Sequence, residues 1–245
     1  MNKIEVVIIN WKRPKNVKII VEAITEQTIP CTLTICDCHP SSEFSLPPST
    51  LKKADRLYRW TRNMGSFNRY LPMAAFDHSY TLFLDDDLLP GRKCLEGFLK
   101  TAEKLNDVFG VLGQFGRMIS PTGQYLSNEV PRGIGIREVD IIVQAYFVKT
   151  KNLHNVLKFR WEIDYFEDEL PEDDLLLCSS LKFYHDLRCY LLPRDESRES
   201  NIDKWCLNRD FALCDRPDHL LKRQQFINRI ITHGWKPLIM TGIRK

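Results

Sequence analysis

YTLFLDDDLLP, residues 80–90, is the stretch from which the fold can be worked out. Its mainly apolar first half is short and ends in turn residues, which predicts a buried β-strand. Three aspartates, Asp85, Asp86 and Asp87, close that strand. Because side chains alternate along an extended backbone, Asp85 and Asp87 should point one way and Asp86 the other.

Two carboxylates on one side of a strand end repel each other, and a divalent cation removes that conflict. Mg²⁺ or Mn²⁺ suits such a place, because these ions take few protein carboxylates and complete their shell with phosphate oxygens and water. The competing interpretation is a solvated turn whose aspartates cap a helix expected over residues 91–106.

The N-terminal segment predicts a βαβ unit. Residues 5–9 (EVVII) form a continuous apolar strand, and Pro14 is suited to the first turn of the helix that follows. Four apolar residues at helical spacing mark its buried face: Val17, Ile20, Val21 and Ile24. A second strand over residues 33–36 ends at Asp37. Strand, helix and strand within about forty residues imply a parallel sheet with a right-handed crossover.

The remaining pattern continues the alternation of strands and helices. Further strands are expected at 56–60, 108–115, 139–148 (the longest of the second half) and 189–192, and helices at 66–78, 175–181 and 220–232. The charged segment 194–216 is expected to be a loop that contains a mobile lid. No repeat or linker is visible, so we expect one domain over residues 1–245, with a nucleotide-binding half (about 1–115) and an acceptor-side half (about 116–245).

Composition narrows the class of protein. Hydrophobic residues make up 43% and charged residues 27% of the 245, ordinary values for a globular protein. A net charge of +3 without a basic stripe gives no support for nucleic-acid binding. No signal segment or membrane span is visible, which predicts a soluble cytoplasmic protein. The eight cysteines include no CxxC pair, so we expect reduced, mostly buried thiols and no zinc site.

Ligands of open α/β sheets bind beyond the carboxyl ends of the strands. The polar or aromatic residues expected there are Asn10, Trp11, Arg13, Asp37, Asn63, Gly65 and Asp85–Asp87. They offer an aromatic face, hydrogen-bonding groups for a base or ribose, and a metal site for a diphosphate. A nucleoside diphosphate fits this set.

Five segments together resemble the GT-A glycosyltransferases, in particular the family-2-like members. They are VVIINWKRP with LTICD, NMGSFNR (with Asn63, Gly65 and Arg69), FLDDD, VDIIVQAYFVKTKNL and PEDDLLL, within residues 4–185. The resemblance implies a GT-A, Rossmann-like α/β fold with a mixed, mostly parallel central sheet flanked by helices.

The resemblance also implies roles for single residues. Asp37 would hydrogen-bond the base, Trp11 would pack on it, and Asp85 would contact the ribose. Asp87, with Asp85, would ligate Mn²⁺ or Mg²⁺ between the donor phosphates. Asn10, Arg13, Asn63, Gly65, Arg69 and Asp86 would complete the nucleotide-sugar site.

Asp173 would be the general base for the acceptor hydroxyl, with Asp174 as the alternative. Independently of the resemblance, a metal that handles the leaving diphosphate leaves a need for one carboxylate beside the anomeric carbon. Favourable negative charge at a helix N-terminus explains Glu172–Asp174 about as well.

The implied function is metal-dependent transfer of a sugar from a nucleotide-diphosphate sugar, UDP-linked by preference, to a hydroxyl of a glycan or glycoprotein. Inversion is favoured, although a DDD motif also occurs in retaining exostosin-like enzymes. The late histidines match no metal-ligand context, and Arg194, Arg198 and Lys204 are candidates to neutralise the departing diphosphate. A sugar nucleotidyltransferase and a catalytically degenerate binding module are the alternatives; the first is disfavoured because residues 10–14 contain no glycine.

Overall fold

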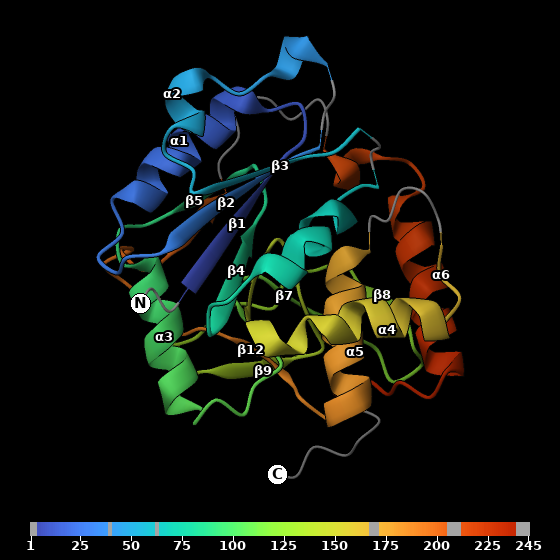
Figure 1. The fold of residues 1–245 in the computed structure, drawn as a ribbon. Coiled ribbons are helices and arrows are strands. Elements are labelled where there is room, and N and C mark those ends of the chain that lie inside the picture. The colour runs from blue at the N-terminus through green and yellow to red at the C-terminus, as the bar shows by residue number, and fades with distance from the viewer. Residues whose placement is uncertain (1–3, 39–40, 62–63, 167–171, 205–211, 239–245) are drawn as a thin grey trace.

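An eight-stranded sheet runs through the computed structural model, which describes residues 4–38, 41–61, 64–166, 172–204 and 212–238 (Figure 1). The strand order is β3-β2-β1-β4-β11-β6-β12-β9. In that order the strands are Arg56–Arg59, Thr32–Asp37, Ile4–Asn10, Tyr80–Leu84, Ala145–Lys149, Val111–Gly113, Cys189–Leu191 and Arg137–Val139. Only β11 and β9 run against the other six. This is the mixed, mostly parallel α/β sheet expected from the sequence.

Two smaller sheets are attached to the central one. One has the order β10-β7-β8, formed by Ile141–Ile142, Gly116–Ile119 and Tyr125–Leu126. The other pairs β13 (Ile202–Lys204) with β5 (Leu88–Pro90), which directly follows the aspartates. The second pair joins the turn after β4 to a segment more than 100 residues later.

Helices cover both faces of the central sheet (Figure 1). On one face α1 (Pro14–Thr25) and α3 (Cys94–Lys104) pack in one apolar cluster, and on the other α4 (His154–Glu162), α5 (Asp173–His185) and α6 (His219–Thr232) pack in a second. Short helical segments occupy Ser42–Phe44 (η1), Pro48–Leu51 (α2), Thr150–Asn152 (η3) and Leu213–Asp215 (η4). Helix α1 begins at Pro14, and the four apolar residues of its predicted face are buried.

The strand predicted over residues 139–148 is wrong as a single element. The chain leaves β9 after Val139, forms the two-residue β10, and enters β11 at Ala145. Gln144, just before β11, has φ 69°, a left-handed conformation that no regular strand accommodates. The apolar run is continuous because Val139, β10 and nearly all of β11 are buried, and burial alone does not distinguish one strand from three.

The helix predicted over residues 66–78 is shorter and of another type. Phe67–Ala75 (η2) is a 3₁₀ helix with Pro72 inside it. Proline has no N–H for the i−4 hydrogen bond and clashes with the preceding turn, so a regular α-helix is disfavoured here. Apolar residues at helical spacing would form one face here, but only part of it is buried: Phe67 and Tyr70 are buried, whereas Ala74 is exposed.

All seven cysteines in the described part of the chain are free thiols, and five of them are buried. Burial raises the pKa of Cys38 to about 12 and raises the pKa of Cys36 further. Among the described helices, none is both long and apolar enough to cross a bilayer.

Candidate functional site

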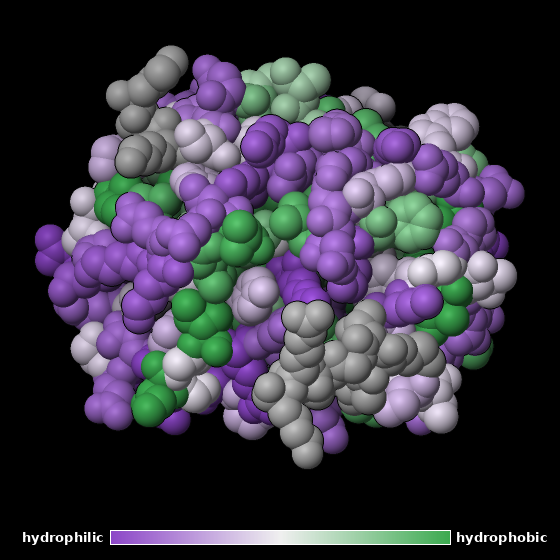
Figure 2. Space-filling view, turned by 90° about the horizontal axis from the view of Figure 1, so that it is seen from below, coloured by the Kyte–Doolittle hydropathy of each residue, from purple (hydrophilic) through white to green (hydrophobic). Residues whose placement is uncertain are grey.

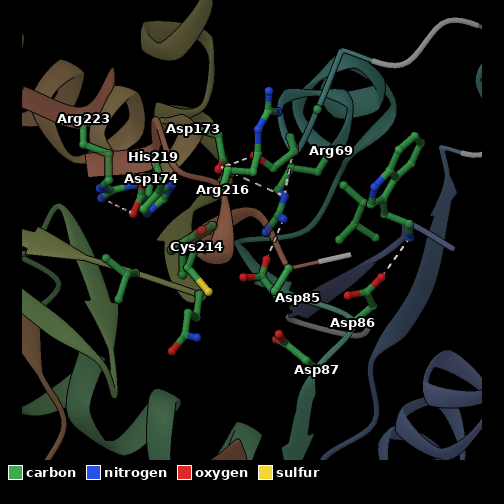
Figure 3. Close-up of a pocket in the computed structure, with 18 of the residues that line it drawn as sticks. Arg69, Asp85, Asp86, Asp87, Asp173, Asp174, Cys214, Arg216, His219 and Arg223 are labelled. Atoms are coloured by element: carbon green, nitrogen blue, oxygen red, sulfur yellow. Dashed lines mark hydrogen bonds and ion pairs between the residues drawn. The ribbon is translucent and has the colours of Figure 1, made fainter. Parts of the chain in front are cut away.

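A cavity of about 410 Å³ opens at the carboxyl ends of β1 and β4. Its wall combines residues from the turns after these strands, the start of η2, the β10–β11 junction, the start of α5, and residues 212–223 (Figure 3). The expectation that ligands bind beyond the strand ends therefore coincides with a real concavity, which is where doubly wound sheets place their sites.

Asp86 ties the first β–α turn to the aspartate turn. Its carboxylate accepts hydrogen bonds from the Trp11 backbone N–H (2.8 Å) and from Arg13 Nη1 (2.7 Å). Asn16 Nδ2 donates to the Asp86 carbonyl at 3.0 Å. Burial raises the pKa of Asp86 to about 6, against the opposing effect of Arg13. Asp86 lines the cavity, yet its carboxylate is occupied by protein partners.

Asp85 and Asp87 lie on the other side of that turn, as the alternation predicts (Figure 3). Asp85 Oδ1 accepts a hydrogen bond from Arg69 Nη2 at 2.6 Å. Burial, with a smaller contribution from neighbouring carboxylates, raises the pKa of Asp85 to about 8 despite Arg69. Asp87 has a buried oxygen, Oδ1, with no hydrogen-bond partner among the described residues. The other Asp87 oxygen, Oδ2, lies 3.4 Å from Arg13 Nη1, so Oδ1 is the Asp87 oxygen left without a partner within the described residues.

Asp173 faces the aspartate turn from the start of α5 (Figure 3). Its Oδ1 accepts a hydrogen bond from Ser66 Oγ at 2.5 Å, and its Oδ2 lies 3.4 Å from Arg69 Nε. Arg69 is 2% exposed and thus links Asp85 to Asp173 through one buried guanidinium. Burial raises the pKa of Asp173, which is the direction that a general base acting near neutral pH requires.

Asp174 has a different environment from its neighbour. Arg223 of α6 binds both of its oxygens, at 3.0 and 2.7 Å. The Arg223 guanidinium also lies 4.6 Å from the Tyr125 ring. A carboxylate held by two hydrogen bonds from one arginine anchors α6 to α5. Of the two candidate bases, Asp173 is the one with an oxygen, Oδ2, that accepts no hydrogen bond from a described residue.

The other predicted site residues divide into three groups. Trp11, Arg13, Gly65 and Arg69 line the cavity, and Gly65 has φ 62°, which glycine adopts without strain. Asn10 and Asp37 lie outside the lining: Asn10 Nδ2 donates to Asp37 Oδ1 at 2.9 Å, and Asp37 also pairs with Arg59. Asn63 lies outside the described residues.

Several lining residues were not predicted from the sequence, among them Gln144, Arg216 and His219. Gln144 was assigned to the interior of a strand, Arg216 to the end of a generic charged segment, and His219 to no site. The cations named there instead have partners elsewhere: Arg198 pairs with Asp203, and Lys204 with Glu129. No local motif marks Arg216, which precedes α6, or His219, which is its first residue.

The residues present are compatible with Mn²⁺ or Mg²⁺ at Asp85 and Asp87. The unpartnered Asp87 oxygen and the raised pKa of Asp85 both indicate a site where positive charge is favourable. Two carboxylates suffice for an ion that takes its other ligands from phosphate and water.

The described residues contain one group of three ligand atoms close enough to share an ion: Glu5, Asp77 and His78. It does not belong to the cavity, because Glu5 and Asp77 lie at the opposite, amino ends of β1 and β4. Arg56 already pairs with both carboxylates, at 2.6 and 3.1 Å. This group is accounted for as an ion-pair network in which Glu5 is buried and Asp77 is exposed.

The sheet order, the helices on both faces and the cavity at the strand ends define a GT-A fold. Solved structures that share it include S. aureus TarS 1–349 in complex with UDP, with TM-score 0.54 and 14% identity over 80% of this chain and 62% of that chain. The complex of TarS 1–349 with UDP-GlcNAc has TM-score 0.54 and 14% identity over 81% of this chain and 60% of that chain. The chain thus spans about three fifths of the TarS 1–349 structures. No protein-family model and no curated protein matches the sequence.

Proposed function

We propose that this protein is a metal-dependent glycosyltransferase that moves a sugar from a UDP-sugar to a hydroxyl of a glycan or glycoprotein, with inversion at the anomeric carbon. One observation carries the proposal: the Asp85–Asp87 pair and Asp173 line one cavity from opposite elements. The fold that it shares with TarS, crystallised with UDP and with UDP-GlcNAc, supports a uridine nucleotide as the donor group.

In the proposed reaction the acceptor hydroxyl oxygen attacks the anomeric carbon from the side opposite the leaving group. The carbon–oxygen bond to the diphosphate breaks, and the nucleoside diphosphate leaves with the electron pair. The hydroxyl proton passes to Asp173, which Ser66 and Arg69 hold in place. Asp85 and Asp87 would hold Mn²⁺ or Mg²⁺, which would supply charge neutralisation for the diphosphate.

The first experiment is a panel of nucleotide sugars incubated with the protein and Mn²⁺, with released nucleoside diphosphate as the readout. We expect UDP release from one or a few UDP-sugars and none after chelation. Pyrophosphate formed from a sugar 1-phosphate and a nucleoside triphosphate would instead identify a nucleotidyltransferase.

Two substitutions separate the proposed roles. Asp87→Ala should abolish metal-dependent turnover, because it removes the carboxylate with the unpartnered oxygen. Asp173→Asn should retain donor binding, measured by calorimetry, and lose transfer. Mn²⁺-dependent donor binding that survives Asp87→Ala would contradict the metal assignment, and unaltered transfer by Asp173→Asn would contradict the assignment of the base.

A further inference from the structure

Gln144 lines the cavity with a side chain that no other described residue engages. Its Oε1 is buried and has no hydrogen-bond partner within the described residues. Leaving a buried amide oxygen unsatisfied costs about 1–3 kcal/mol, so such groups usually have a ligand or a water as partner. A carboxamide both donates and accepts, which matches a pair of neighbouring hydroxyl groups.

The backbone at Gln144 is held in an uncommon conformation. Its φ of 69° is left-handed, and Gln lacks the local hydrogen bonding that lets Asn and Asp adopt this region. The Ala145 N–H donates to the Val143 carbonyl at 2.8 Å, and the Asp85 N–H donates to the Gln144 carbonyl at 3.3 Å. The strained residue is therefore fixed directly beside the aspartate turn. Strain of this kind is concentrated at ligand-binding positions.

The strand order indicates which part of a donor lies beside Gln144. Trp11 and Arg13 follow β1, the aspartates follow β4, and Gln144 precedes β11, which is the next strand across. A donor with its nucleoside near Trp11 and its diphosphate at Asp85 and Asp87 continues toward β11. Neighbouring strands lie about 4.8 Å apart. The sugar attached to the diphosphate would therefore lie about one strand spacing beyond Asp85 and Asp87, beside the start of β11.

We propose that the Gln144 carboxamide binds hydroxyl groups of the donor sugar and thereby helps to select which sugar is transferred. This assignment rests on the proposed function and adds to it a residue that distinguishes UDP-sugar from UDP. The nucleoside and the diphosphate make no contact with this side chain.

Two substitutions at this position separate sugar binding from backbone strain. Gln144→Ala and Gln144→Gly both delete the carboxamide, but only glycine adopts φ 69° freely. By calorimetry with Mn²⁺, both variants should bind UDP within twofold of wild type. Both should bind the UDP-sugar that wild type prefers, among UDP-glucose, UDP-galactose and UDP-N-acetylglucosamine, about fivefold to tenfold more weakly, the effect of one lost hydrogen-bonding group.

Thermal unfolding provides the control, because Gln144→Gly should have a higher Tm than Gln144→Ala. The proposal is overturned if the affinity of the two variants for the UDP-sugar differs in the same order as their Tm values, instead of being lowered in both by the loss of the carboxamide. It is also overturned by an equal loss of affinity for UDP and UDP-sugar, or by no loss at all. If the wild type binds neither UDP nor any UDP-sugar, the proposed function itself fails and the assignment of Gln144 falls with it.

Discussion

Asp173 and Asp174 are adjacent in sequence and equally buried, yet their carboxylates have opposite environments. Asp174 is bound through both oxygens by Arg223, whereas Asp173 keeps an oxygen without a hydrogen-bond partner among the described residues and has a raised pKa. The first arrangement stabilises the fold. The second costs stability, as groups poised for proton transfer usually do.

This difference predicts contrasting effects on stability without any substrate. Asp174→Asn leaves Arg223 as a buried cation without its partner charge, which costs about 3–5 kcal/mol and lowers Tm by on the order of 10 °C in a chain of this size. Asp173→Asn removes an ionisable group whose burial is unfavourable and leaves Arg69 with its second partner, Asp85, so its Tm should fall less than that of Asp174→Asn. Scanning calorimetry of the two purified variants measures both Tm values. A lower Tm for Asp173→Asn than for Asp174→Asn would refute the stabilising role of the Asp174–Arg223 pair.

The sequence identified the aspartate residues but not their partners. Asp85–Asp87 and Glu172–Asp174 are local runs that mark strand and helix ends, so they are recognisable without a structure. Arg69 was placed in the site because of a motif, but its role as a link between Asp85 and Asp173 depends on residues 16 and 104 positions away. Asp86 likewise proved to bind Trp11 and Arg13, a contact that no local pattern encodes.

At the scale of elements, the pair β5–β13 fixes the segment after the aspartates. The Gly91 N–H donates to the Asn201 carbonyl and the Lys93 N–H to the Glu199 carbonyl, both at 2.7 Å. Asp195 accepts hydrogen bonds from Ser197 and Ser200 within the same loop. Residues 195–204 therefore buttress the segment after the aspartate turn, whereas the cavity lining includes Ala212, Cys214, Arg216 and His219.

Close packing at Gly91 makes this buttress testable. A Cβ at Gly91 would lie 2.4 Å from the Glu199 carbonyl oxygen, whereas a Cβ at Gly133 would meet nothing within 4 Å. Gly91→Ala should cost about 1–3 kcal/mol, or about 2–10 °C in Tm, and Gly133→Ala should change Tm by less than about 2 °C. Equal melting temperatures for the two variants would show that the loop is not held against Gly91.

Elements with one strong local signal were predictable, and those set by distant contacts were not. Strands β1, β2 and β4 and helix α1 follow the apolar patterns closely, because each is buried by regular side-chain spacing. The break at Gln144 was missed, because a buried strand and a buried turn share the same composition. It coincides with the cavity, as expected where function overrides local preference.

At the scale of the whole molecule, buried acids make the unliganded protein sensitive to pH. Asp85 has a folded-state pKa of about 8, above the ordinary value of 3.8. The folded state therefore holds a proton that the unfolded state releases, and the stability from this group falls as pH rises between these two values. His219, whose pKa burial lowers, acts in the opposite direction.

Comparison with one variant isolates the effect of Asp85. The Tm of Asp85→Asn minus that of wild type, both without metal, should increase from pH 5 to pH 8, because the variant has no carboxyl to ionise in the buried site. Differential scanning fluorimetry at several pH values measures this directly. A difference that stays constant across the range would mean that Asp85 titrates normally in the folded protein.

The surface at the lower end of the molecule is mostly hydrophilic with scattered apolar patches (Figure 2). Large apolar side chains are exposed at several separate places in the described chain, including Ile134 at 95%, Trp161 at 71% and Leu221 at 61%. Isolated exposed apolar residues are normal for folded proteins and indicate no partner by themselves.

The antiparallel strand β11 has a consequence for how the chain is made. It lies between β4 and β6, although it follows both in sequence. During synthesis from the N-terminus, β4 emerges more than sixty residues before its second neighbour. Until Lys149 has left the ribosome, the free edge of β4 remains a template for strands of other nascent chains. The strand that leads into Asp85–Asp87 thus keeps an unpaired edge through a long part of its synthesis.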